Sequence, residues 1–156
     1  GLAPTLSTMQ GGGQEPKIIQ RGHGYNQGGE HDIAPTLTSN SYHENNVLKI
    51  TEATSQGYAE AEIGDSVNLS HPNSKTRRGR VGKQIANTLL TGESQGVVEP
   101  DFRIRKLTPR ECWRLQGFPD WAFDKAQEVN SNSQLYKQAG NSVTVNVIAA
   151  IAKELK

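Results

Sequence analysis

The sequence predicts an α+β fold, in which a β-hairpin-rich region over about residues 1–100 precedes short helices over about residues 101–156. In the first region, short β-branched runs are separated by Gly, Asn and Pro, a pattern typical of strands and tight turns. From Arg103 onward, helix-capping residues and apolar residues at helical spacing take over. The 156 residues include 16 Gly and 7 Pro and are 33% hydrophobic, so we expect many turns and a small core toward the C-terminal third.

A five-residue pattern recurs three times in the hairpin-rich region, at Leu2–Leu6, Ile33–Leu37 and Ile85–Leu89. Each copy leads into a short apolar run that we predict to be a strand: Ile18-Ile19, Val47–Ile50 and Val97-Val98. The irregular spacing excludes a solenoid, and chance recurrence is the alternative. Alternation over Ser66–Ser70 favours another strand, whereas Tyr58–Ile63 fits a helical turn or a strand.

The first predicted helix begins with a capping box. Thr108 is a good N-cap, Pro109 suits the first helical position, and Glu111 stands three residues after the cap. We expect this helix to run to about Gln116 and to end at Gly117.

Two further helices are expected after it. One covers about residues 133–138 and ends at Gly140, and the last begins near Ser142 or Val143. Apolar residues at helical spacing define the predicted buried face of the last helix: Val143, Val147, Ile151 and Leu155.

Composition limits the compartment and the partners. A single cysteine excludes an intrachain disulfide and fits a reducing, cytoplasmic setting. We expect no membrane partner, because no apolar run approaches the roughly 18 residues needed to cross a bilayer. The four histidines lack metal-ligand spacing, so no metal site is expected. The net charge of +1 means that any nucleic-acid surface must be local.

Two strings carry a resemblance to a known family. The string RKLTPRECWRLQGFPD, from Arg105 to Asp120, and the string QLYKQAGNSVTVNV, from Gln134 to Val147, resemble the last two motifs of the DNA (cytosine-5)-methyltransferases, in the same order. The resemblance implies a bacterial or phage enzyme, of the kind found in restriction-modification systems. Such an enzyme flips a cytosine out of double-stranded DNA and methylates its C5 with S-adenosylmethionine. It also implies that residues 1–100 form a target-recognition domain and that residues 101–156 pack on a Rossmann-like catalytic domain missing from this sequence.

The resemblance also implies roles for residues of the two strings. The junction between recognition and catalytic domains would be organised by Arg105, Thr108, Arg110 and Glu111. For Arg110 and Arg114, the alternative is that they are solvated or pair with nearby acids. Part of the S-adenosylmethionine pocket would be lined by Asn141, Ser142 and Val143. Here the alternative is that Gly140 only ends one helix and Ser142 only begins the next.

The sequence offers no catalytic residue. Cys112 lies within a predicted helix and lacks the Pro-Cys-Gln context of the family's nucleophile, so we interpret it as structural. We therefore expect the chain to be a piece of a longer enzyme, inactive by itself and able to self-associate through its last helix. The alternatives are a stand-alone DNA-binding module and the recognition subunit of a split methyltransferase.

DNA contacts are expected from two segments. The stronger is a basic cluster formed by Lys75, Arg77, Arg78, Arg80 and Lys83, where Gly79 and Gly82 would let the backbone approach phosphates. The second is a polar loop with groups able to read base edges: Asn40, Tyr42 and His43, followed by Asn45 and Asn46. The alternatives are a solvated loop for the first segment and a plain turn for the second.

Overall fold

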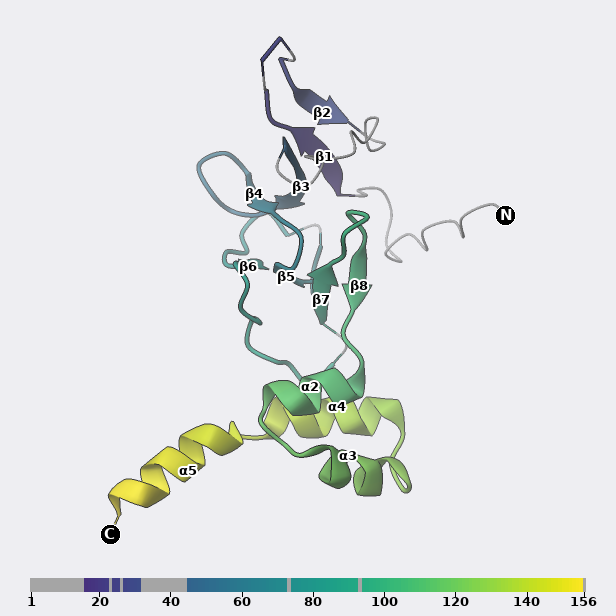
Figure 1. The fold of residues 1–156 in the computed structure, drawn as a ribbon, viewed down its shortest axis with the longest axis vertical. Helices are drawn as coiled ribbons and strands as arrows, with labels where there is room; N and C mark the ends of the chain where they lie inside the picture. Colours follow the sequence, from purple (N-terminus) through teal and green to yellow (C-terminus); the bar gives the residue numbers. More distant parts are fainter. Residues whose placement is uncertain are drawn as a thin grey trace.

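The computed structural model describes residues 16–22, 24–25, 27–31, 45–72, 74–92 and 94–155. Two antiparallel sheets lie at one end of the molecule and a group of helices at the other, as Figure 1 shows. The α+β class predicted from the sequence is therefore confirmed. The pattern copies at Leu2 and Ile33 and the loop residues Asn40, Tyr42 and His43 lie outside the described residues.

The first sheet has the strand order β2-β1-β3-β4. Its strands are β1 (Lys17–Gln20), β2 (Gly29–His31), β3 (Asn46–Thr51) and β4 (Tyr58–Ala61). Ile18 pairs with Leu48, and Leu48 pairs with Ala61, so buried apolar side chains share one face across three strands. The ambiguous segment at Tyr58 is thus a strand. Asn46, expected in the polar loop, is buried in β3.

The second sheet has the order β6-β5-β7-β8. Its strands are β5 (Ser66–Asn68), β6 (Val81–Gly82), β7 (Gln95–Val98) and β8 (Ile104–Lys106). One apolar cluster joins both sheets: Ile18, Leu48, Ile50, Ala61, Val67, Val98 and Phe102. The expectation of a core mainly in the C-terminal third is wrong, because isolated apolar residues from many short strands meet here.

The helical part contains α2 (Pro109–Leu115), α3 (Asp120–Gln127), α4 (Asn132–Asn141) and α5 (Val145–Glu154). Helices α2, α3 and α4 enclose a second cluster around Trp113, whose indole N–H donates to the carbonyl of Leu135 at 3.0 Å. The Trp113 ring also meets Phe123 edge-on, with ring centroids 5.6 Å apart. This arrangement leaves α5 outside the cluster.

The capping box and the left-handed Gly117 confirm the predicted limits of α2. Helix α3 was not predicted, because its first turn carries only the Pro119 entry signal and no side-chain cap. Gly140 does not end α4, contrary to expectation. A Cβ there would lie 2.4 Å from the carbonyl oxygen of Leu90, so the glycine allows the helix and the Leu90 segment to approach closely.

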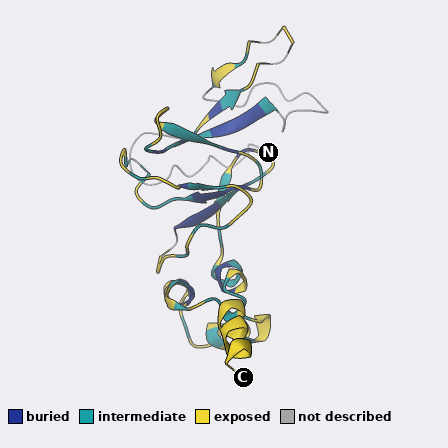
Figure 2. Cartoon of the chain, turned by 90° about the vertical axis from the view of Figure 1, so that its left-hand side faces the viewer, coloured by how far each residue is buried: buried dark blue, intermediate teal, exposed yellow. Residues whose placement is uncertain are grey.

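Helix α5 extends away from the other helices (Figure 1), and Figure 2 shows it exposed along its length. No α5 residue is buried. The expectation of a buried face at Val143, Val147, Ile151 and Leu155 is wrong for this chain, because no described element covers that face. None of the helices in the described part of the chain is long and apolar enough to cross a bilayer.

Candidate functional site

The predicted basic cluster lies in the connection between β5 and β6 and just after β6. The structure separates its five members into three groups. Lys75 and Arg78 are exposed and make no hydrogen bond or ion pair with any residue that the structure describes. Arg77 is half-buried and donates to the hydroxyl of Ser70. Arg80 and Lys83 are held by partners inside the protein, so Lys75 and Arg78 are the cations of this cluster most available to a ligand.

Of the five residues, Arg80 differs most from the predicted DNA contact, because only 3% of its surface is exposed. Its Nε and Nη2 donate to the carbonyl of Asn68 at 3.2 and 3.1 Å. Its Nη1 donates to the carbonyls of Thr51 and Pro72 at 2.7 and 3.1 Å. Burial lowers the pKa of Arg80 from its ordinary value, and the charge of nearby Glu52 opposes that shift. A guanidinium enclosed by carbonyl groups is a structural tie rather than a DNA contact, which corrects the expectation for this residue.

The backbone of this loop is also engaged within the protein. The amides of Gly79 and Arg80 donate to the two carboxylate oxygens of Glu52 at 2.6 and 3.0 Å. Gly79 has the left-handed φ of +66° that this amide arrangement needs. The place that the sequence assigned to a phosphate is thus filled by a carboxylate of the same chain.

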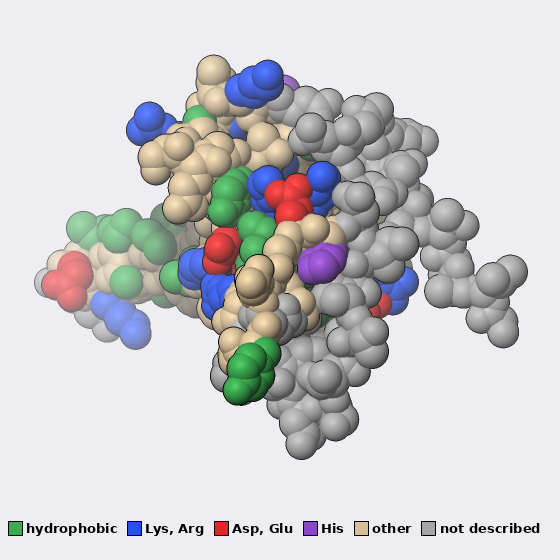
Figure 3. All heavy atoms as spheres, turned by 90° about the horizontal axis from the view of Figure 1, so that it is seen from above, with side chains coloured by type: hydrophobic (Ala, Val, Ile, Leu, Met, Phe, Trp, Pro, Cys, Tyr) green, Lys and Arg blue, Asp and Glu red, His purple; other side chains and the backbone are tan. Residues whose placement is uncertain are grey.

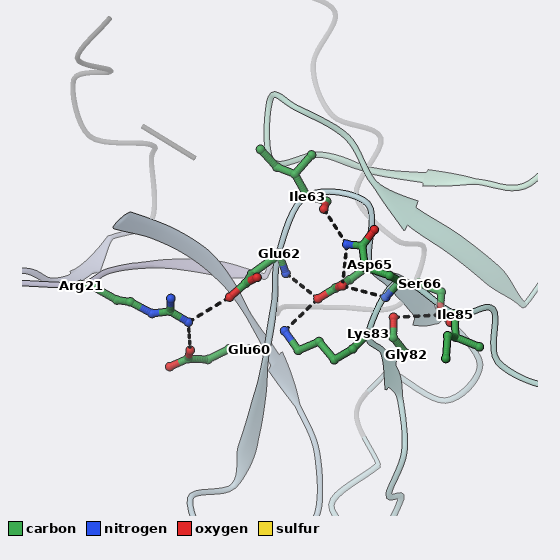
Figure 4. Close-up of polar contacts among 10 residues, drawn as sticks. Arg21, Glu60, Glu62, Ile63, Asp65, Ser66, Gly82, Lys83 and Ile85 are labelled. Atoms are coloured by element: carbon green, nitrogen blue, oxygen red, sulfur yellow. Dashed lines mark hydrogen bonds and ion pairs between the residues drawn. The ribbon is translucent and has the colours of Figure 1, made fainter. Parts of the chain in front are cut away.

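Lys83 is paired with the buried carboxylate of Asp65, with 2.8 Å between Nζ and Oδ2, as Figure 4 shows. Asp65 is 1% exposed and also accepts from the amides of Glu62 and Gln84. Burial by itself raises the pKa of Asp65, but the bonds from Lys83 and the two amides lower it by more. The Lys83 charge is therefore largely balanced within the chain.

The turn after β6 is held in one conformation. Gln84 has a φ of +55°, unusual for a residue with a side chain, and its side-chain amide donates to Asp65 and to the carbonyl of Ile63. Ser66 donates its hydroxyl to the carbonyl of Ile85 at 2.6 Å (Figure 4). A Cβ on Gly82 would lie 2.2 Å from that same carbonyl oxygen. Gly82 thus serves this tight turn instead of the close phosphate approach expected from the sequence.

Arg105, Glu111 and Thr108 join the second sheet to the helices. Arg105 of β8 donates two parallel bonds of 3.0 Å to the carboxylate of Glu111 in α2. Glu111 also accepts from the Thr108 amide at 2.7 Å, completing the capping box. The Arg105 bonds are the largest cause that lowers the pKa of Glu111 to about 2. The same carboxylate therefore caps the helix and fixes the sheet-to-helix connection.

The two arginines on α2 pair with acids of α3, as the alternative interpretation had it. Arg110 lies 2.6 Å from Asp124 and covers the Phe123 ring at 4.5 Å. Arg114 makes two bonds to Asp120, of 2.8 and 2.6 Å. These contacts connect α2 with the start and middle of α3.

A cavity of about 380 Å³ between the second sheet and α2 was not predicted from the sequence. Its lining is mainly apolar and includes Ile85, Ala86, Val97, Leu107 and Leu115. Sequence patterns could not reveal it, because these residues come from four separate segments.

Cys112 is 5% exposed, and burial together with the Glu111 charge raises the pKa of its thiol to about 11. A buried, protonated thiol is a poor nucleophile, which supports the structural interpretation. Among the described residues, no group of three or more His, Cys, Asp or Glu is placed to hold a metal ion.

The residues Asn141–Val143 lie where α4 ends and the chain turns toward α5. Asn141 and Val143 are exposed, whereas the Ser142 hydroxyl donates to the carbonyl of Ala139 at 2.8 Å and ends α4. Ser142 is therefore a C-cap and not the N-cap of α5, and Thr144 takes the N-cap position.

Gln116 holds this turn and was missed from the sequence. Its side-chain amide donates to the carbonyl of Ala139 at 2.9 Å and accepts from the hydroxyl of Thr144 at 2.8 Å. Its backbone carbonyl accepts from the amide of Val145 at 2.8 Å. Gln116 of the first string thus holds the turn of the second string in place.

Comparison with known proteins agrees with both strings. The family model described as C-5 cytosine-specific DNA methylase matches residues 15–156. The orphan methyltransferase M.SPBetaI of Bacillus phage SPbeta is 37% identical over 159 residues, which cover 99% of this chain and 28% of that protein. The orphan methyltransferase M.Rho11sI of Bacillus phage rho11s is 39% identical over 174 residues, covering 99% of this chain and 32% of that protein.

A shorter match lies in the type II methyltransferase M2.ScrFI of Lactococcus lactis subsp. cremoris, with 52% identity over 62 residues. That match covers 38% of this chain and 17% of the relative. No solved structure matches the chain. The chain spans about a third or less of the length of these relatives. Because the family model matches most of its length, the chain belongs to the C-5 cytosine-specific DNA methylase family.

Proposed function

We propose that this chain supplies the target-recognition part of a DNA cytosine-5 methyltransferase, together with part of the wall of its S-adenosylmethionine pocket. Residues 1–100 would form the recognition domain, and residues 101–156 the segment that joins it to a catalytic domain. The observation that carries the proposal is the family match over residues 15–156, which includes both motif-bearing strings. The parent would transfer a methyl group to C5 of a cytosine flipped from double-stranded DNA.

The DNA side of the proposal rests on the loop between β5 and β6. Lys75 and Arg78 are exposed cations on a loop whose neighbours are held internally, so they are placed to contact phosphates or bases. Arg77 and Lys83 would contribute less, since Ser70 and Asp65 already engage them. Arg80 supports the loop from inside.

The cofactor side rests on the turn between α4 and α5. The exposed amide of Asn141 and the exposed aliphatic side chain of Val143 fit the polar and apolar parts of S-adenosylmethionine, which supplies the methyl group when bound. Ser142 and Gln116 would keep this turn in place. The junction group of Arg105, Thr108, Arg110 and Glu111 would hold the recognition part at a constant angle to the catalytic domain, which would cover α5.

Methyl transfer with labelled S-adenosylmethionine and mixed-sequence duplex DNA tests the proposal. We expect no turnover by the chain alone, because the one thiol is buried and has a pKa of about 11. We expect turnover when the chain is combined with a family catalytic domain carrying the nucleophile. Turnover by the chain alone, or failure of every combination to methylate or bind DNA, would overturn the proposal.

A further inference from the structure

The loop from Ser74 to Gly79 carries both exposed cations, and two buried charged residues tie it to the sheets. We propose that Glu52 and Arg80 are positioning residues for DNA recognition, which hold this loop in one orientation and so determine sequence preference more than overall affinity. This inference rests on the proposed function, because it assumes that the loop meets DNA.

Glu52 reaches from the first sheet to the loop. It directly follows β3 and receives one loop amide on each carboxylate oxygen, from Gly79 at 2.6 Å and from Arg80 at 3.0 Å. The next residue, Ala53, donates its amide to the carbonyl of Arg77 at 2.7 Å. These hydrogen bonds fasten the end of the loop to the end of β3.

Arg80 reaches back from the loop to both sheets. Its guanidinium donates to the carbonyls of Thr51 in β3 and Asn68 in β5, and also to that of Pro72, two residues before the loop begins. The carbonyl of Arg80 accepts from the amide of Asn68 and from the side chain of Asn87, at 2.8 and 2.9 Å. The two residues therefore fix both ends of the loop from opposite directions.

Burying the charges of Glu52 and Arg80 costs free energy unless their hydrogen bonds are made, and these bonds form in only one orientation of the loop. Glu52 is 8% exposed and Arg80 is 3% exposed, and each is bonded mainly to backbone groups rather than to the other. Buried charges are costly unless all their hydrogen bonds are made, so a shifted loop would leave a charge without partners. Lys75 and Arg78 are consequently presented on a loop already ordered before DNA binds, which reduces the cost of recognition.

The same hydrogen bonds limit how the end of the loop could meet DNA. Because Glu52 occupies the amides of Gly79 and Arg80, these two amides are not available to a phosphate. DNA would be read through side chains, whose direction depends on the loop.

Selection from a pool of random-sequence duplexes, followed by sequencing, tests the inference on the 156-residue chain. Glu52→Gln keeps the shape but replaces one acceptor oxygen by a donor. Gly79→Ala strains the left-handed position without a steric clash, since no atom lies within 4 Å of an added Cβ. Each change should reduce the enrichment of the wild-type site by about tenfold for every base that the loop no longer reads. Affinity for the unselected pool should stay within about twofold of the wild-type value.

Glu62→Gln is the matched control, because it removes the same charge from an exposed acid that bonds Arg21 and leaves the loop untouched. It should select the wild-type site unchanged. The positioning role is overturned if both loop variants select the wild-type site with unchanged enrichment, if enrichment and pool affinity fall together, or if the control behaves like the variants. A wild-type chain that selects no site, either alone or combined with a family catalytic domain, instead refutes the proposed function, and the inference falls with it.

Discussion

The two-sheet region and helix α5 differ in whether contacts within the chain cover and pair their side chains. In the sheets, even buried charges such as Arg80, Glu52 and Asp65 find hydrogen-bond partners within the chain. On α5, apolar side chains remain in solvent, as the hydrophobic surface at the left of Figure 3 shows. The buried charges of the sheets are thus satisfied within the chain, whereas α5 exposes an apolar face that no described element covers.

The largest expected effect is a loss of stability when the hydrogen bonds of the buried Arg80 are removed. Arg80→Met removes the donors of three carbonyl groups and should lower the free energy of unfolding by about 3 kcal/mol. Urea denaturation measures this change. Arg78→Ala, an exposed change in the same loop, should alter stability by less than about 0.5 kcal/mol. Equal effects would show that Arg80 is not the tie that its hydrogen bonds indicate.

A pair of apolar truncations compares the two regions directly. Leu48→Ala empties a fully buried site and should cost about 3 kcal/mol, whereas Ile151→Ala should cost less than about 0.5 kcal/mol because that residue is 52% exposed. Thermal unfolding followed by circular dichroism provides both values. A large loss of unfolding free energy in Ile151→Ala would mean that α5 is covered within this chain, which would contradict the difference between the two regions.

The sheet-to-helix connection should show a defined pH dependence. The pKa of Glu111 is lowered to about 2 from 4.5, so its stabilising bonds are fully present above pH 4.5 and are lost as the pH falls toward 2. Glu111→Gln should therefore lower stability at pH 7 by about 1–2 kcal/mol. The difference in the free energy of unfolding between Glu111→Gln and the wild type should shrink as the pH falls and Glu111 of the wild type becomes protonated. A difference that stays constant down to pH 2 would contradict this assignment.

The exposed cations of the loop should act through charge. Lys75→Ala and Arg78→Ala should each weaken binding to duplex DNA by about 1 kcal/mol and reduce the salt slope by about one. Fluorescence anisotropy across a salt series measures both. Lys125→Ala is the control, since Lys125 lies on α3 and pairs with Glu128. An unchanged slope in both loop variants would remove this loop from the DNA surface.

The smallest effect concerns self-association through α5. At high concentration, light scattering should detect weak oligomers, because a face with Val147 and Ile151 in solvent gains by burial. The double change Val147→Ser and Ile151→Ser should abolish them. A wild-type chain that stays monomeric at all concentrations would contradict this prediction.

Local signals in the sequence predicted local features correctly. The capping box of Thr108 and Glu111, the end of α2 at Gly117 and the strands β1, β3, β5 and β7 follow from interactions within a few residues. The short strands β2, β6 and β8 were not predicted. The junction residues also lie close in sequence, since Arg105 and Glu111 are six positions apart. Helix α3 escaped prediction because it lacks a side-chain cap and begins after a proline that usually marks an ending.

The predicted roles of some single residues were wrong because those roles depend on contacts between segments far apart in the sequence. Arg80 was grouped with exposed cations, yet its position depends on Glu52, 28 residues earlier. Gly140 was assigned to a helix end, yet its place is decided by the distant Leu90 segment. In each case the residue type was compatible with two roles, and only the packing of distant segments selected one.

The sequence by itself determined the family, the α+β class and the ends of the best-capped helix, because these depend on contiguous residues and nearby hydrogen bonds. Only the tertiary structure decided which cations of the basic cluster are exposed, which glycines serve close packing and which apolar face has no cover among the described residues. The physical reason is that burial and charge pairing depend on segments that meet in space, and a linear pattern does not state which segments meet.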